Sequence, residues 1–206
     1  MGNERPIAGG ASNIARVMTP TNRRHLLKLG LGLTASAAAT TFCGPAIAAV
    51  AAPSQRRLAL HNLHTNESFE AVYWQNGRYV PGELSVVNHV LRDYRSGDVH
   101  QMDPRLLDLL NEVALRTNTR GPFHVISGYR SPKTNAAMHA RSNGVAKQSL
   151  HMQGLAIDIR LPDVDLAKLH QTALGLRRGG VGYYPADNFV HVDVGPVRQW
   201  QGTQAA

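Results

Sequence analysis

The stretch Ser149-Leu150-His151-Met152-Gln153-Gly154-Leu155-Ala156-Ile157-Asp158 decides how the rest of the chain is interpreted. Its His and Asp stand on either side of two small residues, which would let the backbone approach a bound ion closely. The segment Phe189-Val190-His191-Val192-Asp193 supplies a second imidazole. Two imidazoles and one carboxylate suit Zn²⁺, and three protein ligands leave the fourth tetrahedral position to water. The pattern therefore predicts a catalytic metal site made of His151, Asp158 and His191.

A His and an Asp at this spacing are weak evidence when they stand alone, because such pairs arise by chance in many chains. The alternative interpretation is a buried pair in which His151 and Asp158 share a hydrogen bond and no metal. Residues 154–161 and 189–194 both have the pattern of strands, so His191 and Asp158 can converge on one face. This convergence favours the metal interpretation.

Four motifs occur in order along the chain: Ser127-Gly128-Tyr129-Arg130-Ser131-Pro132, S-x-H-x-x-G-x-A-x-D at 149–158, Gly179-Gly180-Val181-Gly182-Tyr183-Tyr184-Pro185, and Phe189-Val190-His191-Val192-Asp193. Together they resemble the zinc D-Ala-D-Ala metallopeptidase family, and within it the periplasmic murein endopeptidase branch. The resemblance spans roughly residues 56–200. It implies a zinc-dependent endopeptidase that hydrolyses the peptide cross-links of peptidoglycan. The alternatives are a D-Ala-D-Ala carboxypeptidase with the same site and a non-catalytic zinc-binding protein of the cell wall.

Zinc in such a site lowers the pKa of its bound water toward about 7 and polarises the scissile carbonyl. Peptide hydrolysis also needs a positive group for the oxyanion and a base for the water proton. The resemblance implies that Arg130 faces the metal and contacts substrate or oxyanion, whereas the alternative is a surface salt bridge. Ser149 and Ser127 are expected to bind the substrate backbone or to support a metal ligand.

The general base is where the sequence departs from the family pattern. Many relatives carry a carboxylate three residues before the last zinc-binding His, and this chain has Asn188 there, whose amide cannot accept a catalytic proton. Asp187 and Asp193 are the nearby carboxylates. We predict Asp193 as the base, because it leaves the same face of its strand as His191. The rival role for Asp193 is to orient a ligand imidazole. Asp187 lies in a turn and is expected to cap a backbone amide there.

Composition limits the class of protein. The chain has 206 residues with 43% hydrophobic and 17% charged residues, which is typical of a globular protein. Of its net charge of +8, the first 48 residues contribute five basic residues and one acidic residue, so 22 − 5 against 14 − 1 leaves +4. This modest charge does not indicate nucleic-acid binding and suits an anionic polymer such as the cell wall. The only cysteine, Cys43, precedes the domain, which excludes a cysteine nucleophile.

Residues 1–48 are predicted to be a twin-arginine-type export signal. Thr21-Asn22-Arg23-Arg24-His25-Leu26-Leu27-Lys28 precedes an apolar run, and Ala46-Ile47-Ala48 offers small residues for cleavage. A membrane anchor is the alternative, but the run is short against the roughly 20 residues that span a bilayer. We therefore expect a periplasmic protein with no membrane span after cleavage. Residues 49–55 read as a linker, 56–200 as the metallopeptidase domain and 201–206 as a tail.

Periodicity predicts the elements of the domain. A β-hairpin is expected over 56–79 with its turn at Thr65-Asn66-Glu67, and a helix is expected to begin at Asp103-Pro104. Further helices are predicted over 83–94, 135–141 and 166–176, and further strands over 123–126, 154–161, 179–184 and 189–194. The sum is an α+β domain in which helices pack on a small, mainly antiparallel sheet with the zinc site on the sheet face.

Overall fold

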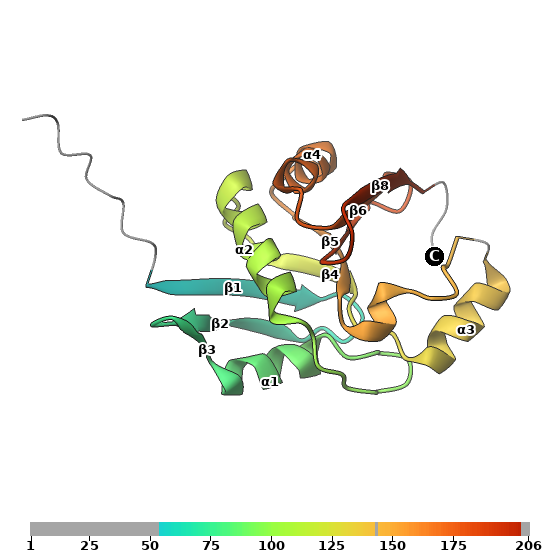
Figure 1. The fold of residues 1–206 in the computed structure, drawn as a ribbon, viewed down its shortest axis with the longest axis horizontal. Helices are drawn as coiled ribbons and strands as arrows, with labels where there is room; N and C mark the ends of the chain where they lie inside the picture. The colour runs from blue at the N-terminus through green and yellow to red at the C-terminus, as the bar shows by residue number, and fades with distance from the viewer. Residues whose placement is uncertain (1–53, 143, 203–206) are drawn as a thin grey trace, which may run out of the picture. The chain divides into compact units, whose positions relative to one another are not determined.

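Eight strands form one sheet in the computed structural model, which describes residues 54–142 and 144–202 (Figure 1). The strands are β1 (Gln55–Asn62), β2 (Ser68–Gln75), β3 (Arg78–Tyr79), β4 (Phe123–Ser127), β5 (Ala156–Arg160), β6 (Gly180–Tyr184), β7 (Phe189–Asp193) and β8 (Arg198–Gln201). The helices are α1 (Pro81–Val90), α2 (Pro104–Thr117), α3 (Pro132–Arg141), α4 (Leu166–Leu176) and the short 3₁₀ helix η1 (Leu150–Gln153). The predicted α+β class is confirmed, whereas the predicted export signal lies outside the described residues.

The sheet is mixed, which corrects the prediction of a mainly antiparallel one. Its strand order is β3-β2-β1-β4-β5-β7-β6-β8, and both the β1–β4 and β6–β8 pairs are parallel. The first pair is parallel because α1 and α2 intervene, so the chain crosses over and returns in the same direction. The second is parallel because β7 lies between β6 and β8 along the chain. The segment that forms β8 is short and polar, so its residues show no strand pattern.

The helices begin where capping residues stand. Asp103 accepts a hydrogen bond from the backbone N–H of Arg105 at the start of α2, as its position before a proline predicts. Ser131 does the same for Thr134, so α3 begins at Pro132 and not at the predicted residue 135. The first helix also begins and ends earlier than expected, at Pro81 and Val90. The predicted helix over 166–176 agrees with α4.

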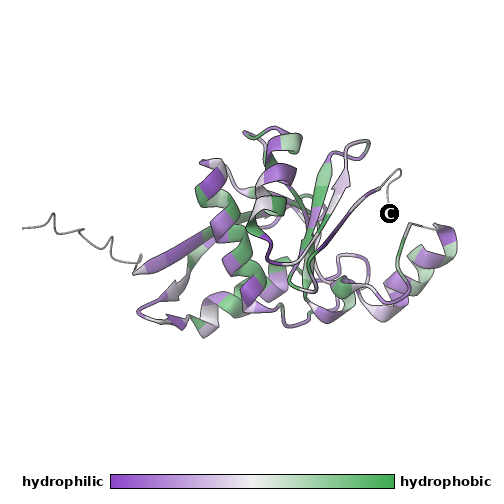
Figure 2. Cartoon of the chain, turned by 45° about the horizontal axis from the view of Figure 1, so that its top comes forward, coloured by the Kyte–Doolittle hydropathy of each residue, from purple (hydrophilic) through white to green (hydrophobic). Residues whose placement is uncertain are grey.

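The core lies between one face of the sheet and helices α1, α2 and α4, which contact the sheet or one another. In Figure 1, α2 and α4 lie over the strands, whereas α3 is set apart from them at one end of the sheet. The alternating hydrophobic and hydrophilic bands along α2 in Figure 2 match a helix with one buried face. That face carries Leu106, Leu107, Leu109, Leu110 and Val113. No helix in the described ranges is long and apolar enough to cross a membrane.

The register of the two central strands separates core from site. In the antiparallel β5–β7 pair, Ile157 lies opposite Val192 and both belong to the core cluster. Because side chains alternate along a strand, the neighbouring pair of Asp158 and His191 leaves the other face. The fold thus places the Asp and one His of the decisive motifs side by side, on the face opposite α2 and α4.

Candidate active site

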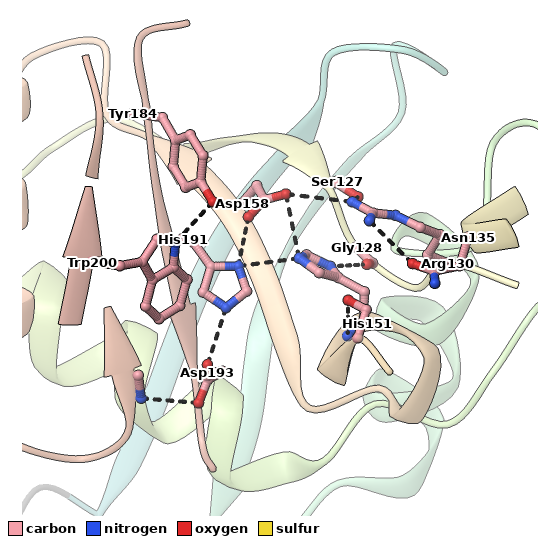
Figure 3. A network of polar contacts seen from close by, with 12 residues as sticks. Ser127, Gly128, Arg130, Asn135, His151, Asp158, Tyr184, His191, Asp193 and Trp200 are labelled. Atoms are coloured by element: carbon pink, nitrogen blue, oxygen red, sulfur yellow. Dashed lines mark hydrogen bonds and ion pairs between the residues drawn. The ribbon is translucent and has the colours of Figure 1, made fainter. Parts of the chain in front are cut away.

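Three side chains with metal-ligating atoms converge on the sheet. His151 comes from η1, Asp158 from β5 and His191 from β7, and one ligand atom of each lies within 4.8 Å of the others (Figure 3). All three residues are buried. Asp158 Oδ1 lies 2.9 Å from His191 Nδ1, and Asp158 Oδ2 lies 3.3 Å from His151 Nε2. The structure therefore brings the three predicted ligands together.

Local structure explains how His151 reaches this position. Ser149 Oγ accepts a hydrogen bond from the backbone N–H of His151 and so starts η1. The helix ends at Gly154, whose φ of 68° lies in the left-handed region that glycine tolerates best. This short helix delivers the imidazole, and the glycine returns the chain directly into β5.

In each imidazole, the ring nitrogen that points away from the other two predicted ligands already has a hydrogen-bond partner. His151 Nδ1 lies 2.7 Å from the Gly128 carbonyl oxygen, and His191 Nε2 lies 3.1 Å from Asp193 Oδ2. Both partners are acceptors, so both nitrogens donate. The two inner nitrogens, His151 Nε2 and His191 Nδ1, then face each other at 3.2 Å. Two lone pairs at this distance repel each other unless a positive charge lies between them, and a metal ion would supply it.

The ionisation of the cluster agrees with a positive charge in this gap. Burial alone would raise the pKa of Asp158, but contacts with His151 and then His191 hold it well below its usual range. Burial lowers the pKa of His151, whereas hydrogen bonds to Asp158 and Asp193 overcome burial and raise the pKa of His191. A single proton at His191 can thus occupy the gap. A cation would replace that proton, and binding would release it. These residues fit a Zn²⁺ ion.

Asp193 lies on the far side of His191 from this gap, where backbone and side-chain donors surround it. Besides the His191 contact, its carboxylate accepts hydrogen bonds from the backbone N–H groups of Gly180 and Gly195, each at 2.9 Å. Arg198 adds contacts of 2.7 and 3.2 Å. Burial alone would raise the pKa of Asp193, but hydrogen bonds from His191, Gly180 and Arg198 lower it well below its usual range. This geometry favours the role of orienting an imidazole over that of a general base.

Arg130 is a buried cation with weak partners. It is 5% exposed, and its guanidinium comes no closer than 3.9 Å to Asp158 Oδ2. Its contacts to Asn135 Oδ1 at 3.4 Å and to Ser127 Oγ at 3.5 Å are long, and its Nε has no partner among the described residues. Burial lowers the pKa of this guanidinium. The alternative of a surface salt bridge does not fit a buried side chain with unused donors beside the cluster.

A cavity of about 240 Å³, the active-site cavity, opens onto the cluster. All three predicted ligands line it, together with Arg130, Ser149, Tyr184, Arg198 and Trp200. The Trp200 ring centre lies 5.0 Å from that of His191, and Trp200 Nε1 donates a 2.8 Å hydrogen bond to the Tyr184 hydroxyl. A Cβ on Gly182 would approach the Trp200 ring to 2.6 Å, so only glycine leaves room for it. The sequence reasoning missed Trp200, whose only signal was the run of glycines in β6.

The two remaining predicted residues take different positions. Ser127 lies beside Arg130 and lines a second, neighbouring cavity, whereas Ser149 lines the active-site cavity. Asp187, the second candidate for the base, also lines the second cavity and is not part of the first. Within the described ranges, Asp158 is the only carboxylate that lines the active-site cavity.

A family model described as peptidoglycan L,D-endopeptidase MepK matches residues 50–200. The chain belongs to the MepK family. A protein of Escherichia coli (strain K12) named peptidoglycan L,D-endopeptidase MepK is 45% identical over 179 residues, which cover 87% of this chain and 97% of the relative. A Haemophilus influenzae protein named probable peptidoglycan L,D-endopeptidase MepK is 39% identical over 185 residues, covering 88% and 96%. No solved structure matches.

Membership of the MepK family confirms the predicted resemblance to murein endopeptidases of the metallopeptidase type. It also confirms the predicted enzyme class, a hydrolase that acts on peptidoglycan peptides. The names of the relatives favour an endopeptidase over the carboxypeptidase and the non-catalytic binder that the sequence left open.

Proposed function

We propose that this protein is a zinc-dependent endopeptidase that hydrolyses L,D peptide bonds in the cross-links of peptidoglycan in the periplasm. One observation carries the proposal. The inner nitrogens of His151 and His191 face each other beside Asp158, at the wall of a cavity that Arg130 shares. A cluster of this kind, in a member of the MepK family, supports metal-assisted hydrolysis of a peptide.

His151 Nε2, an oxygen of Asp158 and His191 Nδ1 would hold the zinc ion. When bound, zinc supplies an activated water and a Lewis acid for the carbonyl. The protein residues do the remaining work. The Gly128 carbonyl fixes the tautomer of His151, and Asp193 fixes that of His191, so that each imidazole turns a lone pair to the same point.

Arg130 is proposed to stabilise the oxyanion and to bind the substrate carbonyl. Its guanidinium is buried at the edge of the active-site cavity and makes only long hydrogen bonds, in surroundings where charge–dipole interactions are stronger than in water. A guanidinium that already had a tight ion pair would have to break it during each turnover. The 3.9 Å separation from Asp158 Oδ2 means that Arg130 has no such bond to lose.

For Asp193 we propose the positioning role in place of the general-base role predicted from the sequence. Its oxygens are occupied by His191, Arg198 and two backbone N–H groups, and a carboxylate with so low a pKa is a weak acceptor for a water proton. Ser149 is proposed to bind substrate only through the part of its hydroxyl that faces the cavity, because the same oxygen caps η1.

The proposed location follows from the substrate, since peptidoglycan lies outside the cytoplasm. Export of this chain by the twin-arginine route remains a prediction from residues 1–48. The charge of +4 that remains after their removal suits an acidic wall polymer.

The deciding experiment is digestion of purified cross-linked muropeptides, with products identified by mass spectrometry. We expect conversion of dimers to monomers, loss of conversion after treatment with a zinc chelator, and recovery when zinc is added. Cleavage that resists the chelator would contradict the metal mechanism. Release of only a terminal D-Ala would show the carboxypeptidase, and intact muropeptides would show the non-catalytic binder.

A further inference from the structure

Arg198, the first residue of β8, connects the edge of the sheet to the buried site. Its guanidinium meets the carboxylate of Asp193 with two prongs, since Nη2 lies 2.7 Å from Oδ2 and Nη1 lies 3.2 Å from Oδ1. The carbonyl oxygen of Pro196 accepts a further hydrogen bond from Nη1 at 3.0 Å. A two-pronged contact fixes the relative orientation of guanidinium and carboxylate. The Arg198 side chain is 42% exposed and that of Asp193 is fully buried, so the pair reaches from solvent into the protein.

The two oxygens of Asp193 are held by different groups. Oδ1 accepts hydrogen bonds from the backbone N–H groups of Gly180 and Gly195, each at 2.9 Å. Oδ2 has two donors among the described residues, His191 Nε2 at 3.1 Å and Arg198 Nη2 at 2.7 Å. The oxygen that faces the imidazole is therefore the one that Arg198 holds most closely. Because the acceptor on its other nitrogen orients a metal-binding imidazole, fixing this oxygen also fixes the direction of the His191 Nδ1 lone pair.

The neighbouring strand β6 leaves room for this arrangement. In the parallel register of β6 and β8, Gly180 lies opposite Arg198 and Gly182 lies opposite Trp200. A Cβ on Gly180 would lie 2.5 Å from Arg198 Nη1 and 2.5 Å from Asp193 Oδ2, so the ion pair would have to shift. The Arg198 guanidinium carbon lies 5.0 Å from the centre of the Trp200 ring, within the range of a cation–π contact. Glycine at 180 and the aromatic ring at 200 together keep the guanidinium in place.

We propose that Arg198 is a positioning residue for the zinc site, which holds Asp193 and, through it, the imidazole of His191. This inference rests on the proposed function, because it takes His191 as a zinc ligand. The alternative is an ion pair that only stabilises the fold. Such a pair would change the free energy of unfolding and leave the zinc affinity of the folded protein unchanged, so zinc affinity separates the two roles.

The zinc affinity of the whole protein is measured by competition with a chromophoric chelator, at a temperature where circular dichroism shows each variant to be folded. Arg198→Gln should weaken zinc binding by about tenfold, the lower end of the range for lost partners of a metal-binding histidine. Arg198→Lys keeps the charge but loses the two-pronged contact. Its zinc affinity should therefore lie between those of Arg198→Gln and the wild-type protein.

Arg56→Gln is the matched control. Arg56 of β1 pairs with Asp108 at 2.6 Å, and its guanidinium carbon lies 4.4 Å from the centre of the Trp74 ring. It thus makes the same two kinds of contact as Arg198, but its carboxylate partner contacts two tyrosine hydroxyls in place of an imidazole. The control should lower the free energy of unfolding and leave zinc affinity unchanged.

Exchange of the His191 Nε2–H with solvent, followed by NMR, gives a second readout that needs no zinc. This proton should exchange faster in Arg198→Gln than in the wild-type protein, because the carboxylate oxygen that accepts its hydrogen bond is no longer held. In Arg56→Gln it should exchange at the wild-type rate.

Wild-type zinc affinity in folded Arg198→Gln would overturn the proposal, and so would an equal loss of affinity in Arg56→Gln. Should Arg198→Gln fail to fold, Arg198→Lys decides, and wild-type affinity and exchange in that variant would overturn the proposal. Muropeptide digestion by the wild-type protein is judged separately. Zinc affinity that depends on Arg198 without digestion would contradict the proposed function alone. Digestion with a zinc affinity that does not depend on Arg198 would contradict the positioning role alone.

Discussion

Asp193 shows how much a single residue's surroundings decide its role. From the strand period it was predicted to lie alongside His191, and it does, but the same period could not reveal what else meets it. Gly180, Gly195 and Arg198 come from other segments, and together they occupy its carboxylate. The convergence of His151, Asp158 and His191 was predictable because these residues belong to one short motif and one strand. The partners of Asp193 were not, because they depend on the register of β6 and on a strand that was missed.

The variant Asp193→Asn separates the two roles. As a positioning residue, Asp193 holds the proton on His191 Nε2, so its loss should weaken zinc affinity by about 10–100-fold, the scale for a lost partner of a metal-binding histidine. Zinc affinity is measured by competition with a chromophoric chelator. Unchanged affinity together with activity lowered by about 10²-fold or more would return Asp193 to the role of general base.

Arg130→Lys tests the oxyanion role at the same scale. Lysine keeps the charge but lacks the planar, multi-donor fork that a carbonyl oxygen or carboxylate engages. We expect zinc content to stay at the wild-type level while kcat/KM for cross-linked muropeptides falls by about tenfold or more. Wild-type turnover in this variant would mean that the unused donors of Arg130 take no part in the reaction.

At the scale of elements, Asp93 in the loop after α1 connects this loop to the segment that carries Arg130. Its carboxylate is buried and accepts hydrogen bonds from the backbone N–H groups of Ser131 and Arg95, at 2.9 and 3.0 Å. Burial alone would raise the pKa of Asp93, but hydrogen bonds from Thr134 and Ser131 lower it to about 2. One carboxylate thus joins the backbone next to Arg130 to the loop that carries Arg95.

Asp93→Asn should lower the free energy of unfolding by about 2 kcal/mol near neutral pH, the scale of hydrogen bonds to a charged group. Because the folded pKa lies below the unfolded one, the wild-type advantage is complete above the unfolded value of about 4. It should disappear as the pH falls through about 2. Urea denaturation of both proteins across this range measures the difference, and a difference that grows toward acid pH would contradict the assignment.

The elements themselves were predicted unevenly. Long periodic segments such as α2 and α4 were identified, α2 together with its capping Asp103, because an amphipathic pattern and a capping Asp are local signals. The parallel pairings of β1 with β4 and of β6 with β8 were not, because the direction of a pairing depends on how the chain crosses over. The strand β8 escaped because Arg198–Gln201 is polar and lies at the edge of the sheet. It carries Trp200, so the missed strand also hid part of the active-site cavity.

For the whole molecule, one face of the sheet supplies stability and the other supplies chemistry. Leu110 of α2 is fully buried in the core cluster, on the side of the sheet opposite the metal ligands. Leu110→Ala should lower the free energy of unfolding by about 2–5 kcal/mol, the range for a buried leucine. Zinc affinity measured well below the melting temperature should not change. A loss of zinc affinity in the folded variant would show that core packing and the site are coupled.

The central claim is that His151, Asp158 and His191 hold a zinc ion, and elemental analysis of the purified protein tests it most directly. The account predicts about one zinc ion per wild-type chain, as three protein ligands and a water bind one tetrahedral ion. The folded His151→Ala and His191→Ala variants should contain almost none, because two remaining ligands hold zinc poorly. Full zinc content in either folded variant would contradict the account.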